Sequence, residues 1–497
     1  MKREELASII VRAREAQKAW AVLPYGKRSA HLKKAASYLA AHVDDISETI
    51  HRENGKLPLD ALAAELVPAV MALGYYRRMG RRFLAEAPVG MGSLLMFNKR
   101  SSLIYKPWGV VGIISPWNYP FAIPFSEVVM ALLAGNAVLL KTASLTPGVG
   151  CSLEELFRAA ELPEGLFTYV ELPGREAGPA FIGSAAAPGV DKLFFTGSTA
   201  TGRELMALAA PRLLPLVLEL GGADAAIVRE DAAPDRAARG LVWAAFSNAG
   251  QSCGGVQRII VHRKVYDAFL EKFCALIRGL RQGIDLGPMA SLKQKQTVCR
   301  QIEACLAKGA QIAAKSEGAF FQDAAAAAVP ALALTGVTPD MPVMNEEIFG
   351  PVAAVIPASD DEEALRIANA SSYGLTGSVW SRNRRRAREL AARINAGAVM
   401  INDHLMSHGL AETPWGGFGD SGLGRTHGEA GFKEMVKVQV VVDDILPAVG
   451  RNIFWHPYSE KVSAGLKALI RVLTGGPGRR LAALPEVFRI FLRYWEK

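Results

Sequence analysis

The sequence contains little cysteine, only five residues among 497. An odd and sparse set of cysteines excludes a disulfide-stapled scaffold and is typical of a reducing compartment. Charged residues make up 21% of the chain, close to the ordinary globular share, which excludes wholesale disorder. A chain of this length forms about two to four structural units and can bury a large core.

Long apolar runs are also missing. The first residues, MKREELASIIVRAREAQKAW, lack the apolar core of a signal peptide. Three prolines interrupt the longest uncharged stretch, residues 107–126, and the next, residues 128–140, is too short. A membrane span needs about 20 apolar residues. We therefore expect no transmembrane helix and a cytoplasmic location.

The excess of positive charge is modest and unevenly distributed. The net charge is +9, from 57 Lys and Arg against 48 Asp and Glu. Residues 451–497 hold nine Lys or Arg and three Asp or Glu, so six of the nine excess charges lie there. A nucleic-acid-binding protein would cluster this charge beside aromatic residues on its body. We expect no nucleic-acid partner.

The order of apolar runs indicates the fold class. Residues 3–86 alternate Ala-, Leu- and Arg-rich stretches, which predicts several helices. Further along, strands are expected at 110–114, 137–140, 166–172, 192–197 and 215–220, with helices near 124–134, 147–160, 175–183 and 199–209. A second block predicts strands at 225–228, 258–261 and 351–356 and a helix at 231–249. This alternation predicts an α/β protein with doubly wound, mostly parallel sheets.

Two further segments stand apart from this alternation. Residues 94–105 place Asn98 between short apolar runs and predict a hairpin arm, and residues 436–443 predict a late strand. The tail predicts two basic amphipathic helices joined by a Gly/Pro hinge. One apolar face is expected from Val462, Leu466, Leu469, Ile470 and Leu473, and another from Val487, Phe488, Phe491, Leu492 and Trp495. Such helices suit a membrane interface, and docking on the body or on a partner subunit is the alternative.

Three short motifs offer catalytic side chains. Cys253 lies between small residues in SNAGQSCGG, where a turn exposes a thiol, whereas the other four cysteines fall in helical stretches and are expected to pack. Glu219 ends an apolar strand before two glycines, where open α/β sheets place functional groups and burial makes a carboxylate a usable base. Asn118 lies on a proline-bounded loop and can donate to an oxyanion. Taken singly, a packing cysteine, a capping glutamate and a turn asparagine remain alternatives.

A fourth motif, FTGSTATG at 195–202, passes from a strand through glycine into a helix. This geometry directs backbone N–H groups at a phosphate, although such turns are often purely structural. The ordered series PWN, KTASxTP, FTGS, LELGG, GQSC, EEIFGPV and PWGGF resembles the aldehyde dehydrogenase superfamily over about residues 5–445.

The resemblance implies an aldehyde dehydrogenase-like fold with two doubly wound α/β domains and a small β oligomerisation arm. The cofactor-binding domain would comprise residues 1–88 and 108–221, the arm 89–107 and 434–446, the catalytic domain 222–433, and a basic amphipathic C-terminal extension 447–497. Because such arms add strands across subunits, a homodimer or homotetramer is expected.

The resemblance also assigns the site residues. Cys253 matches the nucleophile, Glu219 the general base and Asn118 the oxyanion-hole amide. The cofactor residues would be Lys141 at the adenosine ribose, Gly197 and Ser198 at the pyrophosphate, Glu347 and Phe349 at the nicotinamide ribose and ring, and Trp117 beside them. Tyr119 and Trp415 match positions that line the substrate tunnel. No metal is implied, because His404 and His408 have no patterned third ligand.

The implied reaction is NAD- or NADP-dependent oxidation of an aldehyde to its carboxylic acid through a cysteine thiohemiacetal and thioester. Ser144 stands where many NAD-preferring relatives carry a glutamate, which favours NADP or dual use. Residues 402–408 and the PWGGF segment are similar to the branch that handles apolar or aromatic aldehydes. The alternatives are a CoA-acylating aldehyde dehydrogenase and a non-catalytic, membrane-associated protein of the same fold. Peripheral membrane contact would come from residues 451–497.

Overall fold

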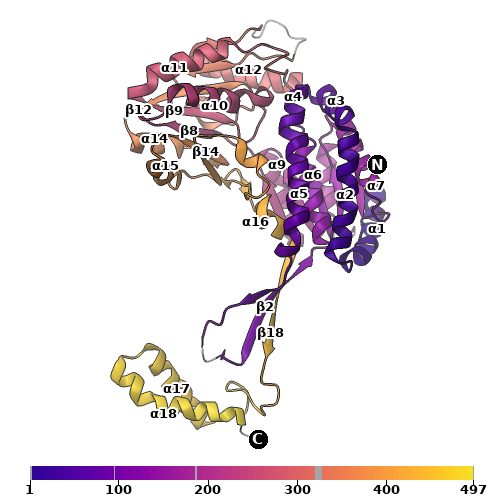
Figure 1. Ribbon diagram of the computed structural model, residues 1–497, viewed down its shortest axis with the longest axis vertical. Helices are drawn as coiled ribbons and strands as arrows, with labels where there is room; N and C mark the ends of the chain where they lie inside the picture. The colour runs from indigo at the N-terminus through magenta and orange to yellow at the C-terminus, as the bar shows by residue number, and fades with distance from the viewer. Residues whose placement is uncertain (1–2, 94–95, 185–186, 319–326, 496–497) are drawn as a thin grey trace. The chain divides into compact units, whose positions relative to one another are not determined.

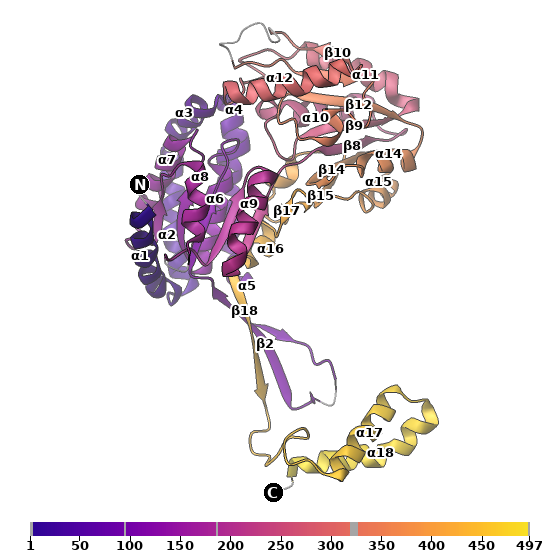
Figure 2. The same cartoon turned by 180° about the vertical axis from the view of Figure 1, so that it is seen from behind.

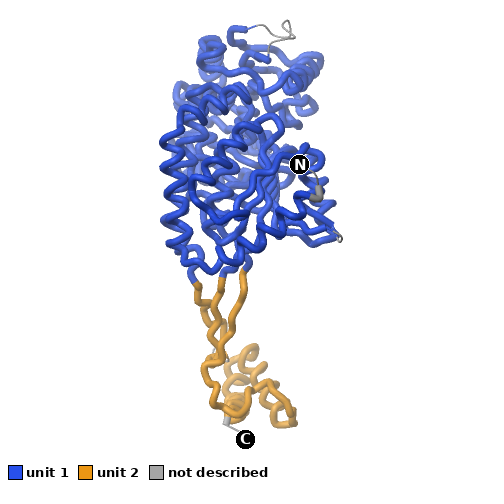
Figure 3. The backbone as a smooth tube through the Cα atoms, turned by 90° about the vertical axis from the view of Figure 1, so that its right-hand side faces the viewer, with its two compact units in different colours: residues 1–85, 105–437 blue, residues 86–104, 438–497 orange. Residues whose placement is uncertain are grey.

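The computed structural model describes residues 3–93, 96–184, 187–318 and 327–495 (Figure 1). The chain forms two compact units (Figure 3). The larger one comprises residues 1–85 and 105–437, and the smaller one residues 86–104 and 438–497.

The larger unit begins with helices α1 (Arg3–Ala21), α2 (Tyr25–Ala41) and α3 (Val43–Asn54). A continuous helical run follows, in which α4 (Pro58–Ala61) and α5 (Val67–Phe83) flank a π-helical turn, η1 (Leu62–Leu66). By length and composition alone, the helical run Pro58–Phe83 could cross a membrane. This run was not identified as a candidate from the sequence. Its buried side chains, among them Leu73 and Tyr76, belong to the core of the unit, as in a packed helix of a globular domain.

A six-stranded sheet forms the first half of this unit, in the order β17-β7-β6-β3-β4-β5. Its strands are β3 (Val110–Ile114), β4 (Ala137–Lys141), β5 (Phe167–Tyr169), β6 (Lys192–Thr196), β7 (Leu216–Glu219) and β17 (Gly422–Leu423), and only β17 is antiparallel to its neighbour. From β3, the order of strands in the sheet continues through β4 and β5 to one edge, whereas β6 and β7 lie on the other side of β3. The order therefore reverses between β3 and β6, where open sheets form a ligand crevice at their carboxyl ends.

Helices cover both faces of this sheet. They are α6 (Ala122–Ala134), α7 (Pro147–Ala159), α8 (Gly174–Ile182) and α9 (Thr199–Ala209). Helix α6, with α2 and α5 against it, lies on one face (Figure 1), and α8 and α9 lie on the other (Figure 2). All thirteen residues of α6 are buried, which explains why this segment is apolar throughout.

A seven-stranded sheet forms the second half, in the order β10-β11-β12-β9-β8-β14-β15. Its strands are β8 (Asp224–Val228), β9 (Val256–His262), β10 (Gln311–Lys315), β11 (Leu332–Thr335), β12 (Val352–Ala358), β14 (Thr376–Trp380) and β15 (Ala398–Ile401). The helices around it are α10 (Pro234–Phe246), α11 (Arg263–Arg278), α12 (Leu292–Ala307), α13 (Pro342–Asn345), α14 (Asp361–Ala368) and α15 (Arg384–Ala391). Helix α16 (Gly428–Lys433) packs instead against α5 and α6 of the first half. The strands are parallel except β10, so the doubly wound α/β prediction is confirmed.

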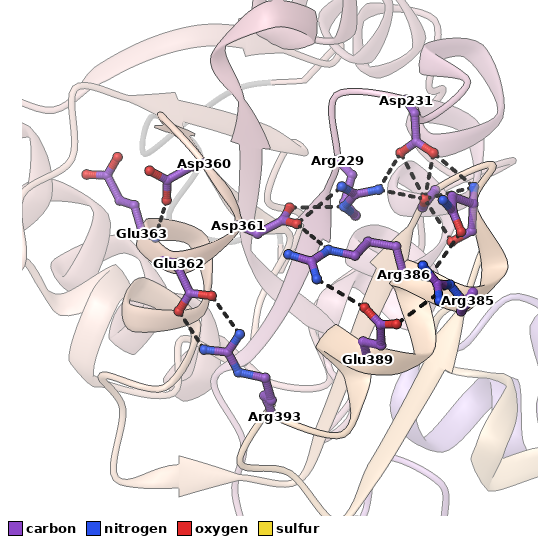
Figure 4. Close-up of polar contacts among 12 residues, drawn as sticks. Arg229, Asp231, Asp360, Asp361, Glu362, Glu363, Arg385, Arg386, Glu389 and Arg393 are labelled. Atoms are coloured by element: carbon purple, nitrogen blue, oxygen red, sulfur yellow. Dashed lines mark hydrogen bonds and ion pairs between the residues drawn. The ribbon is translucent and has the colours of Figure 1, made fainter.

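A cluster of ion pairs fixes the helices that follow β12 and β14 (Figure 4). Arg229, just after β8, contacts Asp361 through Nε at 3.0 Å and Nη2 at 3.2 Å. Arg386 of α15 donates to the same carboxylate at 3.2 Å, and Asp231 accepts from Arg229 at 3.0 Å. Because Arg229 and Asp361 are largely shielded from water, their fork-like contact ties α14 and α15 to the end of β8.

Three expectations need correction. The helix expected at 231–249 ends at Phe246, because Asn248 and Ala249 adopt φ of +53° in a short turn, Ser247–Gly250. The strand expected at 166–172 is shorter, Phe167–Tyr169. Cys151 is exposed on α7 and does not pack in a core, whereas Cys274, Cys299 and Cys305 are buried as expected.

The smaller unit contains a three-stranded sheet and a helical hairpin. The sheet has the order β1-β2-β18, from Ala87–Val89, Lys99–Pro107 and Val436–Asp444, and residues 94–95 of the expected hairpin arm lie outside the described residues. Asn98 is fully buried and donates to both carboxylate oxygens of Asp444 at 3.1 Å, so it ties strand ends together. The hairpin consists of α17 (Glu460–Thr474), α18 (Pro477–Phe491) and a short turn, Leu492–Trp495.

Candidate active site

Cys253 lies where two cavities of the larger unit meet. It follows the turn Ser247–Gly250 and precedes β9. One cavity extends over the carboxyl ends of β3, β6 and β7, and includes Asn118, Ser198 and Glu347 in its wall. The other is bordered mainly by apolar side chains of α5, α10 and the segment 405–415. The thiol is therefore accessible from two sides.

The close packing of backbone segments around Cys253 requires glycine at two positions. At Gly250 φ is +69°, and a Cβ there would collide with the carbonyl oxygen of Gly350. A Cβ at Gly222 would collide with the carbonyl oxygen of Cys253 itself. Because these two glycines have no side chain, the turn between β7 and β8 and the segment just before β12 can pack closely against the loop of Cys253.

The electrostatic surroundings of Cys253 favour the thiol. Although the residue borders both cavities and keeps partial exposure, burial raises the pKa of its thiol well above the ordinary value. The nearby carboxylates of Glu347, Asp224 and Glu219 raise this pKa further. The protein alone therefore holds the sulfur protonated, and formation of the thiolate requires a positive charge or a proton acceptor at the site.

Asn118 lies beside the cysteine loop with its amide held in one orientation. Its Nδ2 donates to the carbonyl oxygen of Gln251 at 3.2 Å, two residues before Cys253. A primary amide has two N–H groups, so one remains for an oxyanion. The Asn118 side chain is buried and its Oδ1 has no hydrogen-bond partner. The geometry suits the donor role that the sequence predicted.

A buried ion pair, which the sequence reading missed, supports the loop of Asn118. Lys56 and Glu65 are in contact, and both side chains have 0% exposure. Lys56 Nζ also donates to the carbonyl oxygen of Asn118 at 2.7 Å, and Glu65 Oε2 accepts from the N–H of Phe121 at 2.7 Å. Glu65 lies in the π-helical turn η1, a distortion that often marks a functional position.

Glu219, the last residue of β7, carries an unusually basic carboxylate. It is buried, and burial raises its pKa well above the ordinary value, with a further increase from Glu127. Arg425 and the indole of Trp415 oppose this rise, although neither Glu219 oxygen accepts a hydrogen bond of normal geometry. Glu127 on α6 has itself a pKa of about 8, because it is desolvated by burial. A carboxylate in these surroundings accepts a proton readily near neutral pH.

The first cavity has the features of a dinucleotide site. The side chain of Ser198 caps α9 by accepting from the N–H of Thr201, so the start of this helix borders the cavity beside Gly197. Such a helix start attracts phosphate. Glu347 accepts from the N–H of Gly222 at 3.0 Å, and burial raises its pKa to about 7. Phe349 contacts Trp117 edge to face at 5.4 Å.

Lys141 and Ser144 lie further along the same edge of the sheet. Lys141 ends β4, beside Ile114 of β3, and burial lowers its pKa. Ser144 is exposed in a shallow cavity with Tyr169 and Glu171. The sequence reading did not anticipate Glu171, a carboxylate that faces the same cavity as Ser144.

The second cavity, which we call the apolar cavity, includes both predicted substrate residues, Tyr119 and Trp415. The rest of its wall is mainly apolar, from Ala63, Ala64, Val67, Pro68, Met71, Trp243, Leu405, Met406 and Leu410. Its titratable side chains are Cys253, Asp60, Tyr119 and His408. Burial and the nearby Lys56 lower the pKa of His408 to about 4, so this imidazole is neutral. Among the described residues, neither Lys nor Arg borders the apolar cavity.

Comparison with known protein families shows to which family this chain belongs. The model of the aldehyde dehydrogenase family matches residues 1–441. The chain belongs to the aldehyde dehydrogenase family. Aldehyde dehydrogenases are oxidoreductases that act on the aldehyde group with NAD or NADP, and the resemblance inferred from the motifs is confirmed.

Individual relatives of this aldehyde dehydrogenase differ in how much of it they match. A protein of Mycolicibacterium smegmatis, provisionally named succinate-semialdehyde dehydrogenase [NADP(+)], is 36% identical over 445 residues, 88% of this chain and 84% of its own. The 4,4′-diapolycopene aldehyde oxidase of a Methylomonas species is 34% identical over 493 residues, 97% of this chain and 90% of its own. Because it covers 97% of this chain, the second match includes most of residues 447–497.

Solved structures give the same fold. The succinic semialdehyde dehydrogenase of Streptococcus pyogenes, in complex with NADP+, has a TM-score of 0.82 and 30% identity, and the match covers 89% of this chain and 95% of that one. An NAD-dependent aldehyde dehydrogenase of Sinorhizobium meliloti has a TM-score of 0.84 and 31% identity, with 92% and 89% covered.

Two histidines of the aldehyde dehydrogenase, His404 and His408, have different surroundings. His404 is fully buried, and its ring nitrogens lie 2.8 Å from Ser378 Oγ and 3.3 Å from Thr376 Oγ1. It is held within the core beside β14, and it does not border the apolar cavity. His408, four residues later, contacts Trp415 at 4.9 Å and forms part of the cavity wall.

Proposed function

We propose that this aldehyde dehydrogenase oxidises a long apolar aldehyde to its carboxylic acid. The observation that carries the proposal is the apolar cavity, whose wall, as far as the described residues form it, includes Asp60 but no Lys or Arg. A substrate with a distal carboxylate would be desolvated there without a partner and would face Asp60, which costs several kcal/mol. An alkyl or polyene chain gains free energy in the same space, at about 25 cal/mol per Å² of apolar surface. The relative named for 4,4′-diapolycopene aldehyde, which matches 97% of this chain, supports the same substrate class.

The residues at the junction of the cavities suit a two-step oxidation. The thiol of Cys253 loses its proton to water, the thiolate adds to the aldehyde carbon, and the resulting oxyanion accepts a hydrogen bond from the free N–H of Asn118. When bound, the oxidised nicotinamide dinucleotide supplies a positive charge near the sulfur and accepts the hydride that leaves this carbon. Glu219 then takes a proton from water, the hydroxide attacks the thioester, and the acid leaves as the thiol of Cys253 is restored.

The cofactor would lie in the cavity beside α9. Its pyrophosphate fits the α9 N-terminus at Ser198, and its nicotinamide end fits between Trp117, Glu347 and Phe349. NADP or dual use is favoured, because the uncharged Ser144 leaves room for a 2′-phosphate and the buried cation of Lys141 is nearby. Glu171 acts against strict NADP specificity, since its carboxylate faces the same cavity.

A substrate panel tests this function. The value of kcat/KM would be measured for a long straight-chain aldehyde, an aromatic aldehyde and succinate semialdehyde, with NAD and with NADP. We expect the long-chain aldehyde to give the highest value. Ala64→Arg, which adds a cation to the cavity wall, should improve succinate semialdehyde selectively. A preference of the unmodified enzyme for succinate semialdehyde would refute the proposed substrate class.

The assay also separates the two alternative functions. A CoA-acylating enzyme needs no water-activating base, whereas the buried carboxylate of Glu219 suits hydrolysis. Release of free acid without CoA therefore supports the hydrolytic reaction. Absence of any aldehyde-dependent NAD(P)H formation would instead favour the non-catalytic alternative.

We propose in addition that the protein is a cytoplasmic homodimer or homotetramer. In the three-stranded sheet, β18 is an edge strand, and its residues Val438, Val440 and Val442 are each more than half exposed. An apolar edge strand readily pairs with a strand of another copy. Light scattering during size-exclusion chromatography measures the assembly, and Val440→Lys should shift it toward the monomer.

A further inference from the structure

The helical hairpin of the smaller unit has an apolar core of its own. Val462 of α17 packs with Ile453, Ile490 and Tyr494. A second cluster joins Ala468 and Leu469 of α17 to Ala483 and Val487 of α18. At Gly465 a Cβ would lie 2.8 Å from the Cβ of Ile490, so the two helices approach closely there. These contacts satisfy the inner faces of both helices.

A second apolar stripe remains on each helix, outside the core of the hairpin. On α18 and the turn after it, the stripe consists of Leu481, Leu484, Phe488 and Leu492, spaced three or four residues apart. Leu481 is 69% exposed and Phe488 is 70% exposed. On α17 the stripe consists of Ile470 and Leu473, both more than half exposed. Helical spacing places such residues on one side of each helix, where a single apolar phase can accept them.

Aromatic side chains extend this surface at the entry to the hairpin. Phe454, Trp455 and Tyr458 are exposed on the loop before α17. The loop is held against the turn that follows α18, because Arg493 of this turn donates to the carbonyl oxygens of Trp455 and Pro457. Exposed Trp and Tyr on a fixed loop are typical of residues that lie at the boundary between lipid and water.

Basic side chains accompany the stripes. Lys467 and Arg471 on α17, and Arg479 and Arg480 on α18, are exposed. Residues 451–497 carry six of the nine excess positive charges of the chain. A second copy of this surface would bring like charges together, whereas an anionic lipid surface complements them.

We propose that the hairpin binds the surface of a membrane that contains anionic lipid, through the exposed stripes and the loop aromatics. Each helix has 15 residues, about 22 Å at 1.5 Å per residue, and is shorter than the about 30 Å of a bilayer core. The hairpin therefore lies in the interface and does not span the bilayer. This binding rests on the hairpin alone and is independent of the substrate proposed for the enzyme.

Vesicle sedimentation of the full-length protein tests the proposal. The probes are vesicles of phosphatidylcholine, with and without phosphatidylglycerol. We expect binding to the anionic vesicles, weaker binding to the neutral ones, and release as salt rises. Leu481→Ser combined with Phe488→Ser should weaken binding by at least about tenfold, because two large side chains lose their burial in lipid. Lys467→Gln combined with Arg471→Gln should weaken it several-fold and reduce the dependence on salt.

Matched controls keep the result interpretable. Val22→Ser combined with Leu213→Ser removes two apolar side chains that are 81% and 88% exposed in the larger unit, and should not change vesicle binding. Oxidation of a water-soluble aldehyde reports whether each variant is folded and active, separately from lipid binding. If the unmodified protein ignores anionic vesicles, the proposal is wrong. If the Leu481/Phe488 variant keeps its vesicle binding but changes its oligomeric state, the hairpin is a subunit contact and the proposal is also wrong.

Discussion

Replacing Lys56 by methionine is expected to lower both stability and turnover, because this side chain serves a buried ion pair and the loop of Asn118. Both Lys56 and Glu65 have 0% side-chain exposure, so the change leaves a buried carboxylate without its cation. Breaking such a pair costs about 3–5 kcal/mol. Glu65 keeps the N–H groups of Phe121 at 2.7 Å and Ala122 at 3.1 Å, so we expect the lower end, about 3 kcal/mol.

The effect of Lys56→Met on turnover depends on the hydrogen bonds that Asn118 keeps in this variant. Its carbonyl oxygen loses Lys56 but still accepts from the side-chain Nδ2 of Asn248 at 3.1 Å, and its own Nδ2 still donates to the carbonyl oxygen of Gln251 at 3.2 Å. The donor is therefore loosened and not removed. We expect kcat to fall about tenfold, less than the about 10²–10³-fold that follows outright loss of an oxyanion donor. Asn118→Ala provides that upper reference.

Urea unfolding and steady-state kinetics with a water-soluble aldehyde measure the two effects. In Lys56→Met/Glu65→Gln the amide oxygen still accepts from the α6 N-terminus and no charge is buried, so stability should recover while turnover stays low. Lys18→Met, which breaks an exposed pair with Glu15, should change stability by less than about 1 kcal/mol. If the double variant regains full turnover, Lys56 does not position Asn118; if the single variant keeps its stability, the buried pair contributes nothing.

Further predictions concern the chemistry, the cofactor and pH. Cys253→Ser should abolish oxidation, whereas Glu219→Gln should keep a first burst of NAD(P)H in stopped flow and lose steady turnover; unchanged turnover would remove Glu219 as the base. Ser144→Glu should lower the ratio of kcat/KM for NADP to that for NAD at least about tenfold, since a carboxylate would face the 2′-phosphate. The pKa of buried His404 is lowered from 6.5 to about 4, so its neutral form stabilises the fold above pH 6.5, and this contribution is lost as pH falls toward 4. Thermal melting between these pH values should therefore depend less on pH in His404→Asn, and an equal slope would contradict the assignment.

Cys253, Glu219 and Asn118 could be proposed as catalytic residues from sequence because each lies in a short motif, and the structure brings their loops together around two cavities. Gly222 and Gly250, which lie in these motifs, are both needed to seat the cysteine loop. Lys56 and Glu65 could not be found this way. Their partners lie 62 and 56 residues away, in a loop whose own sequence gives no sign of them.

The spacing of apolar residues in the two tail helices predicts their burial only in part. The sequence predicted one apolar face on each tail helix, and in the structure each face is divided. Val462 and Val487 pack in the core of the hairpin, whereas Ile470 and Phe488 are exposed. Spacing identifies which side of a helix is apolar, but it does not say how much of that side a neighbouring helix covers.

The meeting of two cavities at Cys253 has a consequence for the order of events. In the proposed reaction, a substrate chain that fills the apolar cavity would remain there while the thioester exists, so water would have little access from that side. The opposite cavity borders the same sulfur and has polar groups in its wall. Departure of the reduced dinucleotide would thus open a polar route for the hydrolytic water, and the rate of acid release would then depend on how quickly the dinucleotide dissociates.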